Sequence, residues 1–154
     1  MRCALGRAGV RADKHEGDGA TPAGWLPLRR VLYRADRLAI PRAAVPREPI
    51  AETDGWCDDP GHADYNRAVR LAHPARHEAP AHHEALWRRD GLYDIVAVLG
   101  WNDAPVRPHF GSAIFLHVAR RDYGPTEGCV ALAAPDLVAL LAAGITALRV
   151  IAPG

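Results

Sequence analysis

One histidine and one cysteine in the second half of the chain are spaced so that they could act as a base and a nucleophile. His117 lies near the end of an apolar run typical of a buried strand, and Cys129 follows a loop that ends in Glu127 and Gly128. This spacing lets the chain leave a strand, turn and return beside it, which would bring the thiol and the imidazole within hydrogen-bond reach. The thiolate is the nucleophilic form of cysteine, and an adjacent imidazole can take its proton and later protonate a leaving amine.

The glycine before the cysteine supports the same chemistry. Gly128 removes a side chain from the path of an incoming carbonyl, and it frees the backbone to direct N–H groups at a developing oxyanion. The predicted reaction is therefore acyl transfer through a thioester. The spacing alone leaves another reading open, in which Cys129 is a small buried apolar residue and His117 a hydrogen-bonded core residue.

Two segments of the chain resemble the YkuD-type L,D-transpeptidases. These enzymes carry a histidine on a strand, then a loop, then a Ser/Thr-x-Gly-Cys motif, and residues 111–132 follow this order. The matching positions are His117, Thr126, Gly128 and Cys129. Residues 14–24 are similar to the family's Gly-x-Thr-Pro-x-Gly segment. The matching positions there are Gly19, Thr21, Pro22 and Gly24.

The resemblance implies a β-sandwich-like catalytic domain with an acyltransferase activity in peptidoglycan biosynthesis, and hence in cell-wall biogenesis and cell shape. The expected partner is a peptidoglycan stem peptide. Its terminal D-residue would be released, and its diaminopimelate carbonyl would pass to Cys129 and then to an amine. The resemblance also implies that a backbone carbonyl next to the histidine, that of Val118, orients the imidazole. No cofactor is expected.

The chain departs from the family pattern around the nucleophile. Glu127 stands where the commoner motif has a histidine, and the loop before the motif is shorter. The apolar segment 130–132 replaces the arginine or asparagine that often follows the cysteine. We interpret the chain as a divergent subgroup with its own substrate and acceptor preference. Glu127 could repel a stem carboxylate, receive a cationic acceptor amine or be a solvated loop residue.

Four other side chains are candidates for contacts with the substrate. Arg120, in preference to Arg121, is suited to clamp a carboxylate through two hydrogen bonds. Tyr123 either walls the pocket or pins the loop, and Thr126 holds the loop through its hydroxyl. Asn102 either bonds a peptide backbone or makes a turn.

A histidine-rich segment raises the alternative of a metal-dependent hydrolase. Its members are His73, His77, His82 and His83. The first two have the spacing of ligands on one helix, yet Pro74 and Pro80 argue against a long regular helix. We therefore predict a titratable surface loop over 73–84 and no metal site. Two further alternatives keep the resemblance: an L,D-carboxypeptidase, in which water resolves the thioester, and a wall-binding module without activity.

Composition excludes several classes of protein. The charge is nearly balanced, with 19 Lys+Arg against 18 Asp+Glu, which argues against a nucleic-acid binder. Three cysteines without a C-x-x-C pair predict neither a disulfide framework nor a cysteine zinc site. No apolar run reaches the roughly 18 residues of a membrane span, and residues 1–14 lack a signal-peptide pattern. The resemblance nevertheless implies the cell envelope or periplasm. The oligomeric state is left open.

The hydrophobic pattern predicts one mainly β domain over 1–154, a small sandwich or barrel-like sheet with one clear C-terminal helix. Strands are expected at 28–34, 93–100, 112–118 and 146–151, with short strands within 2–12. Loops or irregular segments are expected at 13–24, 41–67 and 119–128. The helix is expected at 135–143, because Pro135 suits a first turn and Gly144 suits a stop.

Overall fold

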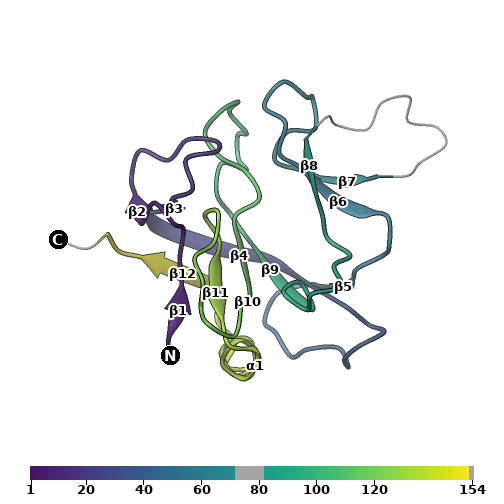
Figure 1. Cartoon of the computed structure of the whole chain (residues 1–154). Helices are drawn as coiled ribbons and strands as arrows, with labels where there is room; N and C mark the ends of the chain where they lie inside the picture. Colours follow the sequence, from purple (N-terminus) through teal and green to yellow (C-terminus); the bar gives the residue numbers. More distant parts are fainter. Residues whose placement is uncertain (72–81, 153–154) are drawn as a thin grey trace.

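The computed structural model describes residues 1–71 and 82–152, and this part of the chain is mainly β with a single helix near its C-terminal end (Figure 1). The first strands are β1 (Cys3–Ala4), β2 (Val10–Arg11), β3 (Thr21–Pro22), β4 (Gly24–Tyr33), β5 (Arg47–Pro49) and β6 (Asp54–Cys57). They are followed by β7 (Ala68–Arg70), β8 (His83–Ala85), β9 (Ile95–Leu99), β10 (Phe115–Val118), β11 (Val130–Leu132), α1 (Ala134–Ala142) and β12 (Ala147–Val150). The predicted fold class is thus confirmed.

The main sheet has the strand order β1-β11-β10-β9-β4-β12, with β5 paired to β4. Most neighbours are antiparallel, but β10 runs parallel to β11 and β4 runs parallel to β5. Every residue of β9 is buried, which explains why its sequence is a continuous apolar run rather than an alternating one. The long strand β4 crosses behind β9, β10 and β11 in Figure 1.

Two apolar clusters cover the two faces of this sheet. On one face, Leu137 and Leu141 of α1 pack with Leu116 of β10. On the other face, Trp56 of the three-stranded sheet β7-β6-β8 packs with Phe115 of β10, ring edge to ring face at 5.3 Å between centroids. Because successive residues of a strand point to opposite faces, β10 contributes to both clusters. The helix and the small sheet therefore lie on opposite sides of the strand that carries His117.

Several predicted boundaries agree with the structure, and others need correction. The helix begins and ends one residue earlier than predicted, and Gly144 after it has a positive φ of 83°. The strand predicted at 112–118 begins only at Phe115, because Ala113 adopts a left-handed φ of 52°. The prediction of a loop over 73–84 is wrong at its end, where β8 begins at His83; residues 72–81 of that segment lie outside the described residues.

Candidate active site

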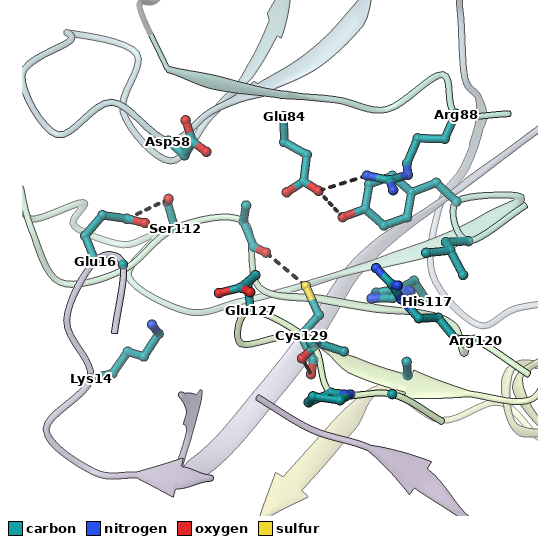
Figure 2. A pocket seen from close by; sticks show the side chains of 18 residues that line it. Lys14, Glu16, Asp58, Glu84, Arg88, Ser112, His117, Arg120, Glu127 and Cys129 are labelled. Atoms are coloured by element: carbon teal, nitrogen blue, oxygen red, sulfur yellow. Dashed lines mark hydrogen bonds and ion pairs between the residues drawn. The ribbon is translucent and has the colours of Figure 1, made fainter. Parts of the chain in front are cut away.

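The pairing of β10 with β11 brings His117 and Cys129 to one face of the main sheet. His117 is opposite Ala131 in the parallel register, and Cys129 lies two residues before Ala131. Side chains two apart on a strand share a face. Both residues line a pocket of about 350 Å³ (Figure 2). The predicted base and nucleophile therefore line one cavity, but among the described residues the thiol hydrogen-bonds to backbone groups and not to the imidazole.

His117 is oriented by the backbone of its own strand. Its Nδ1 lies 2.9 Å from the carbonyl oxygen of Val118. A carbonyl only accepts hydrogen bonds, so Nδ1 carries a proton and Nε2 is the proton acceptor of the neutral ring. The ring also meets Tyr93 edge to face, at 5.2 Å between centroids. Burial lowers the pKa of His117, and the Val118 carbonyl opposes that effect in part, so the imidazole is neutral near pH 7.

Cys129 is held by two backbone groups at the wall of the pocket. Its Sγ donates to the Ala113 carbonyl at 3.3 Å and accepts from the Phe115 N–H at 3.4 Å. Burial raises the pKa of the thiol to about 12, so at neutral pH a protonated thiol and a neutral imidazole line the same pocket. A thiolate–imidazolium ion pair is therefore disfavoured in this structure.

Gly128 is required by the backbone that leads into the cysteine. Its φ is 139°, and a Cβ at this position would lie 2.8 Å from the Ala20 carbonyl oxygen. Its N–H donates to Thr126 Oγ1 at 3.2 Å, and that hydroxyl donates to the Cys129 carbonyl at 2.6 Å. The Gly128 N–H is thus engaged within the turn, and the expected oxyanion role of the backbone around Gly128 stays a prediction. Its contribution is the conformation of the turn.

Two of the predicted substrate contacts lie beside this pair. Arg120 lines the pocket and contributes a positive charge on the side of His117 (Figure 2). Glu127 lines the pocket too, but its carboxylate pairs with Arg7, and both side chains are more than half exposed. Glu127 is therefore a paired residue at the solvent side of the cavity.

Thr126 lines the pocket as well, whereas Asn102 and Tyr123 are not among its lining residues. The side chain of Asn102 accepts from the Arg107 N–H and donates to the Arg107 and Gly111 carbonyls. The ring of Tyr123 lies under the Arg2 guanidinium, 4.4 Å from its carbon to the ring centroid. Both residues have positive φ angles. The structure therefore favours the alternative roles, a turn for Asn102 and a pinned loop for Tyr123.

Comparison with known proteins identifies the family of the chain. The model of the YkuD L,D-transpeptidase catalytic domain matches residues 1–146 of the 154-residue chain. The chain belongs to the YkuD family. No significant match was found among curated proteins or among solved structures.

The opposite wall of the YkuD pocket comes from residues that the sequence did not single out as site residues. They are Lys14, Glu16, Asp58, Glu84, Arg88, Tyr93 and Ser112. They lie on the N-terminal loop, the end of β6, β8 and the segments before β9 and β10, so no local spacing connects them. One signal was present: Lys14 is the single lysine of an arginine-rich chain, and it is 4 % exposed. A buried charge of this kind is uncommon unless it is paired, and Lys14 pairs with Asp18.

The described residues bear on the alternative of a metal site and on membrane insertion. His73 and His77 lie outside the described residues, and His83 stands on β8. Within 1–71 and 82–152, no group of three or more His, Cys, Asp or Glu residues is arranged to hold a metal ion. Within the same ranges, no helix has the length and apolar character needed to cross a bilayer. Cys3, Cys57 and Cys129 are free thiols.

Proposed function

We propose that this YkuD domain is an L,D-transpeptidase in which Cys129 forms a thioester with a peptidoglycan stem peptide. The observation that carries the proposal is the shared pocket of Cys129 and His117, in which a backbone carbonyl leaves Nε2 of the imidazole as the proton acceptor. The neutral thiol and neutral imidazole of the free enzyme support attack coupled to proton transfer.

The first half of the reaction acylates the enzyme. His117 Nε2 takes the proton of Cys129 as Sγ bonds to the carbonyl carbon of the diaminopimelate residue. The C–N bond to the terminal D-residue then breaks, and the imidazolium gives its proton to the departing nitrogen. The Val118 carbonyl, which accepts from Nδ1, favours the imidazolium while it carries the extra proton.

The second half resolves the thioester. An acceptor amine attacks the same carbonyl carbon and loses a proton to His117, the C–S bond breaks, and Cys129 regains its proton. Arg120 binds a carboxylate of the stem, and Thr126 keeps the turn before the nucleophile in place through its two hydrogen bonds. Because the substrate is the cell wall, the enzyme acts in the cell envelope.

A turnover assay with a purified stem tetrapeptide tests this proposal. Mass spectrometry should detect the released D-residue together with cross-linked dimers, and Cys129→Ala or His117→Ala should abolish both products. Cys3→Ala, which removes an exposed thiol outside the pocket, should leave the rate unchanged. Release of the D-residue without dimers would instead make the enzyme an L,D-carboxypeptidase. Undiminished release by folded Cys129→Ala would exclude the proposed nucleophile.

A further inference from the structure

One carboxylate of the opposite wall is held in a fixed position in the pocket that contains the nucleophile. Glu84 on β8 accepts a hydrogen bond from the Tyr93 hydroxyl, and Arg88 Nη1 lies 3.7 Å from the same oxygen, Oε1. The Arg88 guanidinium is itself fixed by Asp90 and lies 4.9 Å from the centroid of the Tyr93 ring. Figure 2 shows Glu84 pointing toward the part of the pocket that holds Cys129.

A negative charge at this position opposes ionisation of the nucleophile. After burial, Glu84 is the next cause that raises the pKa of the Cys129 thiol, whereas Lys14 acts in the opposite direction. Charges interact more strongly in a partly dry pocket than in water, because the effective dielectric constant is lower there. Glu84 therefore adds to the effect of burial in keeping the sulfur protonated.

A second carboxylate increases the negative potential next to Glu84. Burial raises the pKa of Glu84, the Tyr93 hydroxyl and the Arg88 charge oppose that rise, and the charge of Asp58 adds a smaller rise. Asp58 Oδ1 is buried, and within the described part of the chain it has no hydrogen-bond partner. A buried oxygen without a partner is costly. An ammonium group placed between Asp58 and Glu84 would relieve the repulsion between the two carboxylates and give the orphan oxygen a donor.

We propose that Glu84 is a specificity-determining residue that binds a cationic group of the substrate beside Cys129 and keeps the thiol unreactive until that group is in place. This inference rests on the proposed role of Cys129 as the nucleophile. When the cationic group of the substrate pairs with Glu84, the negative charge of Glu84 no longer disfavours the thiolate of Cys129. This happens while the carbonyl carbon of the same substrate is within reach of the sulfur. A substrate without the cation would meet a less reactive thiol.

The other charged and titratable groups of the pocket set the background for this effect. They are Lys14, Glu16, Asp58, Arg88, Tyr93, His117, Arg120 and Glu127. Both signs occur among them, so a preference for a cation near Cys129 does not follow from the net charge of the cavity. It follows from the position of Glu84, with Asp58 close by, and a substitution of Glu84 tests it.

Methanethiosulfonate reagents of different charge measure the local potential at Cys129. A thiolate displaces methanesulfinate from such a reagent and forms a mixed disulfide, so the rate reports on both thiolate population and reagent charge. Three reagents are compared on wild type and Glu84→Gln: the cationic aminoethyl, the neutral methyl and the anionic sulfonatoethyl compound. The reactions are run at about pH 8, because the small thiolate population limits the rate at that pH. Peptide mapping by mass spectrometry separates labelling of Cys129 from that of Cys3 and Cys57. Glu48→Gln is the matched control, since Glu48 lies on β5 outside this pocket.

In Glu84→Gln we expect the ratio of cationic to anionic labelling at Cys129 to fall several-fold and the neutral reagent to react about threefold faster. The gain in thiolate is offset in part because a thiolate of lower pKa is less nucleophilic. Tyr93→Phe, which removes only the hydroxyl that holds Glu84, should change the neutral rate in the same direction by a smaller factor. It provides the test if Glu84→Gln does not fold.

An unchanged ratio in folded Glu84→Gln, or rates that fall for all three reagents in both variants, would overturn the inference. Neither result would bear on the nucleophile itself, because the stem-peptide assay tests Cys129 and His117 separately. Glu48→Gln should match wild type with every reagent, and a shift of the same size there would show that Glu84 has no particular influence on Cys129.

Discussion

The imidazole Nδ1 of His117 lies 2.9 Å from the carbonyl oxygen of Val118, the next residue on the same strand. The group that orients the imidazole is therefore a backbone atom, and no aspartate or asparagine side chain is needed for that purpose. The residue type at position 118 gives no sign of this role, because any residue there supplies the same carbonyl. The arrangement fixes the tautomer of the ring and leaves Nε2 for proton transfer.

The activity should persist at mildly acidic pH. Burial lowers the pKa of His117 below its usual value of about 6.5, and the ring must be neutral to take the thiol proton. The rate constant kcat/KM, measured against pH, should therefore fall on the acid side only below about pH 6.5. A decline that begins at higher pH would contradict the assignment of His117 as the base of the free enzyme.

The buried thiol should make the fold sensitive to alkali. In the unfolded chain Cys129 ionises near pH 8.5, whereas in the folded protein its pKa is raised to about 12. Between these values the unfolded state binds fewer protons, so the free energy of unfolding falls as pH rises, by at most about 1.4 kcal/mol per pH unit. Urea unfolding across this range should show a steeper loss in wild type than in Cys129→Ala. Parallel curves would mean that Cys129 titrates normally in the folded protein.

Alanine at Gly128 should be much more harmful than alanine at another glycine with positive φ. The added Cβ would lie 2.8 Å from the Ala20 carbonyl oxygen, whereas nothing lies within 4 Å of a Cβ at Gly144. We expect Gly144→Ala to lower the free energy of unfolding by roughly 1–2 kcal/mol and Gly128→Ala by about 3 kcal/mol, with loss of turnover only in the latter. Equal losses in thermal unfolding would show that the contact with Ala20 is unimportant.

The hydroxyl of Thr126 should matter more than its methyl group. It donates to the Cys129 carbonyl and accepts from the Gly128 N–H. Thr126→Val keeps the shape of the side chain but removes both bonds, which should cost about 1–2 kcal/mol of stability and lower kcat because the nucleophile is less well held. Thr126→Ser restores the hydroxyl and should retain most of the kcat. Similar kcat values for the valine and serine variants would exclude this role.

Local sequence patterns were sufficient to predict that His117 and Cys129, at β10 and next to β11, lie on one side of the candidate site. The apolar run before His117, the glycine before Cys129 and the turn residues between them each depend on residues close in sequence. The strand β11 was not predicted, since three residues are too few for a periodic pattern to be read. The apolar segment 130–132 nevertheless forms the strand that pairs with β10 and brings Cys129 to the face of His117.

The opposite wall could not be predicted, because contacts between distant segments assemble it. Glu84 and Asp58 belong to the small sheet around β6, whose strands are three or four residues long. That sheet is positioned by packing of Trp56 on Phe115, a contact without a signature in either segment alone. For Asn102 and Tyr123 the sequence left both a substrate contact and a structural role open. The structure favours a turn for Asn102 and a pinned loop for Tyr123.

Intact-mass spectrometry after exposure to a carbapenem tests the central claim most directly, since this β-lactam class acylates enzymes of the family that the chain resembles. A carbonyl that reacts with the sulfur of Cys129 should leave a single covalent adduct on wild type, mapped by proteolysis to the peptide that contains Cys129. Folded Cys129→Ala should show none, and Cys3→Ala should be modified as wild type is. An unmodified wild-type protein, or an adduct that survives in Cys129→Ala, would contradict the account.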